Sequence, residues 1–194
     1  MLNFYTFAKR VVYAALKPLY RIEIIGVEHF PKDGGVLLCS NHISNLDPPV
    51  VGITAPRPVH FMAKEELFHV PVLNKIISNL NAFPVKRGMS DRQALRVGLE
   101  LLNEGRVLGI FPEGTRSKDG KLGKGLSGVG FFALRTNAVV VPCAVIGPYK
   151  PLKKLKVVFG HPIDINDFRE RKAKPEEVTD YIMSHIQSLI EQYK

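Results

Sequence analysis

The stretch that is most informative about the fold is Val36-Leu37-Leu38-Cys39-Ser40-Asn41-His42-Ile43-Ser44-Asn45-Leu46-Asp47-Pro48. It opens with four apolar residues, which favour a buried β-strand. A polar loop follows, and Asp47-Pro48 is typical of a helix start, because Asp is a good N-cap and Pro suits the first helical position. The stretch therefore predicts a strand, a loop and a helix, with the loop at the strand end where α/β folds place ligand sites.

Similar short apolar runs recur along the chain and alternate with helical patterns. They predict strands over residues 21–27, 35–39, 58–63, 81–85, 106–111, 138–146 and 155–160. Helices are predicted from a Ser90/Gln93 capping box to Gly105, through Phe131 and Leu134, and from Pro175 onward. This alternation predicts an α/β fold, in which residues 21–194 form a single domain with a mixed, partly parallel sheet flanked by helices.

Residues 1–20 have the pattern of an amphipathic helix in front of this domain. At 100° per residue, Phe4 and Phe7 fall on one side, and Arg10 and Lys17 fall on the other. Such a pattern is typical of a helix in a membrane interface, and the alternative is a helix packed on the protein's own core. Pro18 is expected to end or kink this helix near Lys17.

The composition limits the kinds of protein that this sequence can encode. The 194 residues suit one domain, and 45% hydrophobic with 23% charged residues is ordinary for a globular fold. Both cysteines, Cys39 and Cys143, lie in apolar runs, which indicates buried, reduced thiols and a reducing compartment. The net charge of +9 leaves anionic membranes, nucleic acids and phosphorylated substrates open as partners.

His42 and Asp47 are the first candidates for chemistry. Five residues apart on an ideal helix, their side chains would point roughly 140° apart, so they can pair only if the segment turns. A carboxylate bonded to one imidazole nitrogen fixes the tautomer and makes the other nitrogen a better base. The competing interpretation is that Asp47 only caps the helix and His42 is a turn residue.

Two further segments also follow apolar strands and carry groups suited to an anion. In Phe111-Pro112-Glu113-Gly114-Thr115-Arg116-Ser117, a flexible glycine is followed by hydroxyl donors and by a guanidinium that matches phosphate. A glycine-rich stretch over residues 120–125 adds Lys121 and Lys124. The other segment, Phe83-Pro84-Val85-Lys86-Arg87-Gly88, offers two more cations. Each segment alone also fits a solvated turn.

Several other kinds of site do not fit the sequence. The stretch from Gly120 to Ser127 lacks the lysine of a P-loop, and Gly125-Leu126-Ser127-Gly128-Val129 lacks the last glycine of a nucleophile elbow. A Cys39 nucleophile is conceivable but disfavoured, because Cys39 completes an apolar strand. The remaining histidines are scattered without zinc spacing, so no metal is expected.

Taken in order, four segments of the sequence resemble the four blocks of the glycerolipid acyltransferases. They are His-x4-Asp at 42–47, Phe-Pro-Val-Lys-Arg at 83–87, Phe-Pro-Glu-Gly-Thr-Arg-Ser at 111–117 and Val-Pro-Cys-Ala-Val at 141–145. The resemblance covers residues 24–160, and the bacterial 1-acylglycerol-3-phosphate acyltransferases are the most similar group. One departure is Lys86, where the family often has an acidic residue.

The resemblance implies transfer of an acyl group from acyl-CoA or acyl carrier protein to lysophosphatidate, with no permanently bound cofactor. It implies that His42 is the general base, oriented by Asp47. It implies that the acceptor's glycerol phosphate is bound by Arg87, Glu113, Gly114, Thr115 and Arg116. Lys86, Ser117 and Lys124 are possible further anion contacts.

The resemblance also implies a setting, and it leaves alternatives. An acceptor that resides in the bilayer gives the N-terminal helix a reason to bind an anionic membrane surface, which places the protein peripherally on the cytoplasmic face of the cell membrane. Glycerol 3-phosphate or another lysophospholipid would use the same base. A non-catalytic basic module for membrane or nucleic acid is the alternative of another class, and no nucleic-acid-binding motif is present to support binding of nucleic acid.

Overall fold

The computed structural model describes residues 4–86 and 91–194 and contains one seven-stranded sheet. The strands are β1 (Ile22–Ile25), β2 (Val36–Ser40), β3 (Val59–Lys64), β4 (Ala82–Val85), β5 (Val107–Ile110), β6 (Val139–Ile146) and β7 (Leu155–Phe159). Their order is β1-β7-β6-β2-β5-β3-β4, and every neighbouring pair is parallel except β6 and β7. The predicted mixed, partly parallel sheet is confirmed, with all seven strands near their expected positions.

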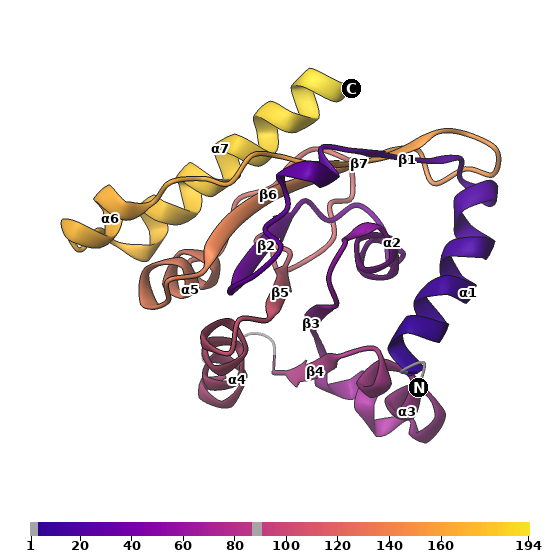
Figure 1. Cartoon of the computed structure of the whole chain (residues 1–194), viewed down its shortest axis with the longest axis horizontal. Coiled ribbons are helices and arrows are strands. Elements are labelled where there is room, and N and C mark those ends of the chain that lie inside the picture. Colours follow the sequence, from indigo (N-terminus) through magenta and orange to yellow (C-terminus); the bar gives the residue numbers. More distant parts are fainter. Residues whose placement is uncertain (1–3, 87–90) are drawn as a thin grey trace.

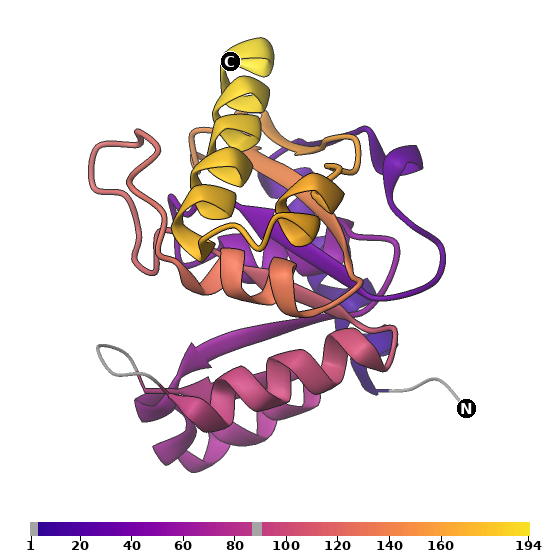
Figure 2. The same cartoon turned by 90° about the vertical axis from the view of Figure 1, so that its left-hand side faces the viewer.

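Helices cover both faces of this sheet (Figures 1 and 2). They are α1 (Phe4–Leu19), α2 (Asp47–Thr54), α3 (Pro71–Asn79), α4 (Arg92–Asn103), α5 (Gly128–Arg135), α6 (Asn166–Glu170) and α7 (Pro175–Tyr193), with 3-10 turns η1 (Val27–His29) and η2 (Glu65–His69). Strand β2 is buried along its whole length, and its side chains alternate between the two faces. This central, fully covered strand carries the polar loop that follows it.

The alternation along β2 divides the core into two layers. Val36 and Leu38 face a cluster that includes Val50 and Val51 of α2, with side chains of α1 packed at its edge. Leu37 and Cys39 face the opposite cluster, which is formed with α4, α5 and α7. The helices therefore hold β2 rigidly from both sides, which fixes the position of its carboxyl end.

Two local predictions differ from the structure. Helix α1 continues through Pro18 to Leu19, because a proline in the last turn removes only one backbone hydrogen bond. Helix α4 is capped by Asp91, whose carboxylate accepts the backbone N–H groups of Gln93 and Ala94. The predicted capping box is therefore wrong, and Ser90 itself lies outside the described residues. Helices α3 and α6 were not individually predicted.

The two cysteines are buried and unpaired, as their apolar surroundings predict. Burial raises the pKa of the Cys39 thiol far above its ordinary value and raises that of Cys143 to about 12. Since Cys39 also faces the α5 and α7 side of the sheet, it has neither the thiolate character nor the access that a nucleophile needs.

Candidate active site

The parallel strands β2 and β5 bring two of the predicted segments together. Leu38 pairs with Gly109 and Cys39 with Ile110, so both strands end at the same edge of the sheet. The loop that contains His42 follows β2, and the loop that contains Glu113 and Arg116 follows β5. Their backbones are joined directly, because the Ser117 N–H donates to the carbonyl of His42 over 2.7 Å.

His42 and Asp47 form the predicted pair. The His42 Nδ1 atom lies 2.8 Å from Asp47 Oδ2, and Asp47 is completely buried. The imidazole ring stacks on Phe111, with ring centroids 4.3 Å apart, which restricts its rotation. Among the described residues, every buried side-chain nitrogen or oxygen has a hydrogen-bond partner. The His42 Nε2 atom has no such partner, so it is not fully buried and solvent can reach it. Nε2 is therefore the atom available to a substrate.

Asp47 does not cap helix α2, contrary to prediction. The helix begins at Asp47, with Leu46 in the N-cap position. The Asp47 carboxylate instead turns back to the loop, where Oδ2 accepts the backbone N–H groups of Ile43 and Ser44, each over 2.6 Å. Because the carboxylate accepts these two N–H groups, it does not cap the helix. The same two bonds stabilise the turn in which His42 reaches Asp47. The interpretation of Asp47 as a simple helix cap is therefore wrong.

Glu113 holds the two loops together. One carboxylate oxygen accepts the backbone N–H of His42 over 2.7 Å, and the other accepts that of Gly123 over 2.8 Å. Glu113 is buried, so these charge-assisted bonds form in a partly dry environment, where they are stronger than in water. The carboxylate thus fixes the backbone at His42. Its predicted contact with the acceptor stays a prediction.

A cavity of about 710 Å³ opens beside the pair. Its polar lining includes His42, Thr115 and Arg116. Its walls are mostly apolar and come from α1, α2, β3 and α3; among them are Val12, Ile53, Phe61, Leu73 and Ile77. The cavity therefore places a candidate base, a cation and room for hydrocarbon side by side, which suits a molecule with a charged head and an apolar tail.

The other predicted anion contacts are more scattered. Gly114 adopts φ +66°, a conformation that favours glycine and turns the chain between Glu113 and Thr115. The Ser117 hydroxyl donates to Asp119, and the Lys86 amine pairs with Glu65 at 3.7 Å. Neither of these side chains lines the cavity, nor does Lys124. Arg87 lies outside the described residues.

The comparisons with known proteins bear on this arrangement. The sequence model of the family described as Acyltransferase matches residues 21–146, which include both loops and strands β1 to β6. The chain belongs to this acyltransferase family. The resemblance found in the sequence is thereby confirmed, and the match places the His42–Asp47 pair inside the family's domain.

Relatives with more specific names are similar to this acyltransferase. The 1-acyl-sn-glycerol-3-phosphate acyltransferase of Bacillus subtilis is 29% identical over 183 residues, covering 88% of this chain and 90% of that protein. The chloroplastic LPAT1 of the same name from Arabidopsis thaliana is 34% identical over 139 residues, covering 70% of this chain and 39% of that protein. The solved structure of the 1-acyl-sn-glycerophosphate (LPA) acyltransferase PlsC from Thermotoga maritima superposes with a TM-score of 0.75 at 27% identity, covering 98% and 78% of the two chains.

Two residues of the acyltransferase site were missed in the sequence. The side-chain amide of Asn41 bridges to β6, donating to the Val145 carbonyl over 2.9 Å and accepting the Val145 N–H over 2.7 Å. This bridge explains the place of the fourth block, which lies in β6 beside β2. Tyr149 donates its hydroxyl to Asp47 Oδ1 over 2.6 Å. Only the order of the strands reveals either contact.

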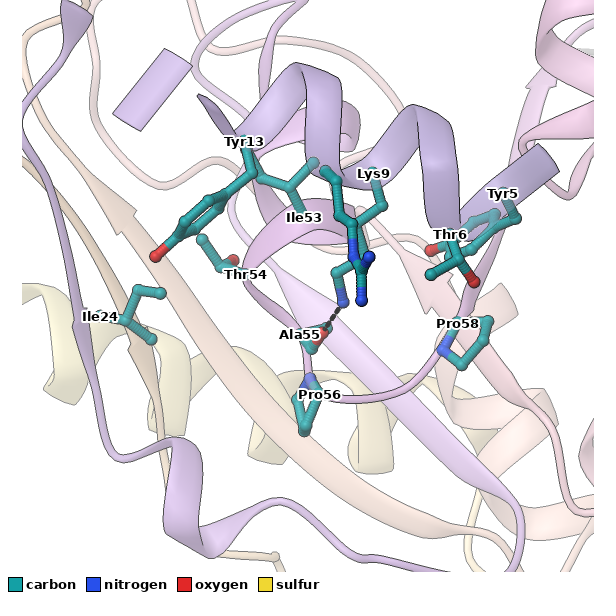
Figure 3. A pocket seen from close by; sticks show the side chains of 11 residues that line it. Tyr5, Thr6, Lys9, Tyr13, Ile24, Ile53, Thr54, Ala55, Pro56 and Pro58 are labelled. Carbon is teal, nitrogen blue, oxygen red and sulfur yellow. Dashed lines mark hydrogen bonds between the residues drawn. The ribbon is translucent and has the colours of Figure 1, made fainter. Parts of the chain in front are cut away.

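A second, smaller cavity of the acyltransferase lies between α1, β1 and the end of α2 (Figure 3). The Lys9 amine donates to the Ala55 carbonyl there, so α1 is tied to the C-terminal end of α2, where a cation is favourable. Burial lowers the pKa of this amine. Of the predicted site residues that the structure describes, none lines this cavity, although Tyr5, Lys9 and Ile53 line both cavities.

Proposed function

We propose that this acyltransferase moves a fatty acyl group from acyl-CoA or acyl carrier protein to the free sn-2 hydroxyl of 1-acylglycerol 3-phosphate, giving phosphatidate. The observation that carries the proposal is the single cavity shared by His42, Thr115 and Arg116. The names of the relatives support this acceptor. The apolar walls suit acyl chains, both that of the donor and that of a lipid acceptor.

The proposed reaction uses His42 as a general base. Nε2 removes the proton of the acceptor hydroxyl, and the hydroxyl oxygen attacks the thioester carbonyl carbon. Asp47, bonded to Nδ1, holds the tautomer and stabilises the imidazolium that forms. When the tetrahedral intermediate collapses, the C–S bond breaks and the imidazolium returns its proton to the departing thiolate. No protein nucleophile is needed, in agreement with the buried Cys39.

We assign the acceptor's phosphate to Arg116, with Thr115, Gly114 and Arg87 as the other contacts. Arg116 is exposed and lines the cavity, so its planar guanidinium is free to bind a phosphate with two parallel hydrogen bonds. Glu113 contributes to the same site indirectly, because its carboxylate fixes the backbone of His42.

Replacing Arg116 by alanine is expected to raise KM for lysophosphatidate about 10–100-fold with little change in kcat, because a charge-assisted hydrogen bond contributes about 1.5–3 kcal/mol. Steady-state kinetics at varied lysophosphatidate measure this. Arg96, exposed on α4, provides the matched control, and Arg96→Ala is expected to behave as wild type. An unchanged KM in Arg116→Ala would remove Arg116 from the phosphate site.

The donor is tested by supplying labelled acyl-CoA and labelled acyl carrier protein in parallel, with lysophosphatidate in mixed micelles. Labelled phosphatidate with either donor supports the proposal and selects the donor. If neither donor gives phosphatidate, while one of them acylates a different lysophospholipid, the proposed acceptor is wrong.

We also propose that the enzyme binds peripherally to an anionic membrane, on the cytoplasmic face. Among the described residues, no helix is both long and apolar enough to cross a bilayer. Helix α1 packs on the protein through Val12 and Leu16, yet the opposite apolar side, with Phe4 and Phe7, is exposed. Both interpretations of this helix thus have support, each for a different face.

A second exposed apolar surface flanks the same cavity. Helix α3 turns Leu73 and Ile77 into the cavity, while Val72 and Ile76 face outward and are exposed. With α1 forming another wall, both surfaces lie beside the cavity that contains His42, and Figure 1 places α3 near the start of α1. A bilayer against these two helices would meet the cavity, so a lipid acceptor could enter without crossing water.

Phe7→Glu and Val72→Glu are each expected to weaken binding to phosphatidylglycerol vesicles about tenfold, because burying one such side chain contributes about 1.5–3 kcal/mol. Phe7 is 57% exposed and Val72 is 72% exposed, so both variants should fold. Vesicle sedimentation measures the binding. Val27→Glu, on η1, adds the same charge at another exposed aliphatic residue and should bind as wild type does. Equal binding by all the proteins would refute this membrane surface.

A further inference from the structure

Asp47 is shared between His42 and a second side chain that enters from far along the chain. Its Oδ2 atom accepts from the imidazole, and its Oδ1 atom accepts from the Tyr149 hydroxyl over 2.6 Å. Tyr149 and Asp47 are 102 residues apart in the sequence, and the loop after β6 brings them together. Tyr149 does not line the cavity, so it has no contact with the space where a substrate would lie.

The surroundings keep the Tyr149 hydroxyl in place as a donor. Its ring packs edge-on against Tyr20, with centroids 5.5 Å apart. The same loop is tied to the end of α1, because the Leu152 N–H donates to the Leu19 carbonyl over 2.6 Å. Burial, together with the Asp47 carboxylate, raises the pKa of the Tyr149 phenol far above its usual range. The hydroxyl therefore remains protonated at any pH at which the enzyme would work.

We propose that Tyr149 is a positioning residue for the His42–Asp47 pair, which fixes the Asp47 carboxylate and takes up part of its negative charge. This inference rests on the proposed role of His42 as the base. Four donors converge on one carboxylate: the imidazole, two backbone N–H groups and the phenol. Each donor reduces the charge that Asp47 can direct at the imidazolium, so the phenol both orients the carboxylate and moderates its effect.

Other charged or titratable groups contact the pair or line the neighbouring cavity, and all of them contribute to the electrostatics of the site. They are Glu113, which accepts the His42 N–H; the Cys143 thiol of β6, near Asp47; and Arg116, Lys9 and Lys64, which line the cavity. A Tyr149→Phe substitution alters none of these groups. A change in the pH profile of that variant therefore reports on the bond to Asp47.

The test is Tyr149→Phe, assayed for acyl transfer across a range of pH. The kcat is expected to fall about tenfold, with KM for both substrates within twofold of wild type, since one bond to a charged group is lost outside the substrate cavity. The acidic limb of kcat/KM is expected to move to higher pH, because Asp47 then opposes the imidazolium with more of its charge. Tyr20→Phe is the matched control, which removes the neighbouring hydroxyl and keeps the ring.

The possible results distinguish a failure of this inference from a failure of the proposed function. A displaced acidic limb in Tyr149→Phe but not in Tyr20→Phe supports the inference. An unmoved limb overturns it, even if kcat falls, because a loss of packing alone lowers the rate without changing the titration. If His42→Ala is inactive while Tyr149→Phe matches wild type in rate and pH profile, only this inference fails. If His42→Ala keeps its rate, the proposed function fails first.

Discussion

His42→Ala is expected to lower kcat for acyl transfer about 10²–10⁴-fold, the usual contribution of a general base. The acceptor hydroxyl would then have to lose its proton to water while it attacks the thioester. Binding of lysophosphatidate should change little, because the phosphate is assigned to Arg116 and the acyl chain to the apolar walls. The measurement is label transfer from acyl-CoA, with KM determined alongside kcat.

The control for this variant is another histidine. His185→Ala, on α7, removes an imidazole that does not line the cavity, and it should leave kcat within about twofold of wild type. Thermal melting of both variants checks the fold. If folded His42→Ala keeps a rate near that of wild type, the polar loop after β2 is only a structural turn, and the general-base mechanism is wrong.

Asp47→Asn is expected to lower kcat about 10²–10⁴-fold without unfolding the chain. An amide in this place can keep its oxygen on the loop N–H groups and turn its NH₂ toward the Tyr149 hydroxyl, which is able to accept. The geometry is then retained, but no negative charge opposes the imidazolium that forms during the reaction. Steady-state kinetics and thermal melting measure the two parts of this expectation.

Asp33→Asn, an exposed aspartate in the loop before β2, is the comparison variant, and it should match wild type. A folded Asp47→Asn enzyme with full activity would show that the charge on Asp47 plays no part in catalysis. The bond between Nδ1 and Oδ2 would then be structural only.

Much of the fold follows from local pattern. The short β-branched runs predicted all seven strands, because a strand buried on both faces, such as β2, leaves a continuous apolar signature. Helix α3 was not singled out, although Val72, Leu73, Ile76 and Ile77 have the spacing of an amphipathic helix. The helix has only nine residues, and a segment this short gives the helical periodicity few turns in which to repeat.

The candidate site could be predicted where the residues are close in sequence. His42 and Asp47 are five residues apart, and their pairing needed only a turn. The role of Asp47 as a helix cap was wrong, because the sequence shows the Asp-Pro pair but not the competing N–H groups of Ile43 and Ser44. Contacts that depend on the order of the strands, such as Asn41 with Val145, had no local signal at all.

We propose that an acyl group is transferred to a lipid hydroxyl in the cavity beside His42. The most direct measurement supplies the enzyme with labelled acyl-CoA or acyl carrier protein and offers lysophosphatidate and glycerol 3-phosphate in separate reactions. Labelled phosphatidate is expected from the first acceptor, and no labelled product is expected from the second. Acylation of glycerol 3-phosphate alone, or release of free fatty acid with no acylated product, would contradict it.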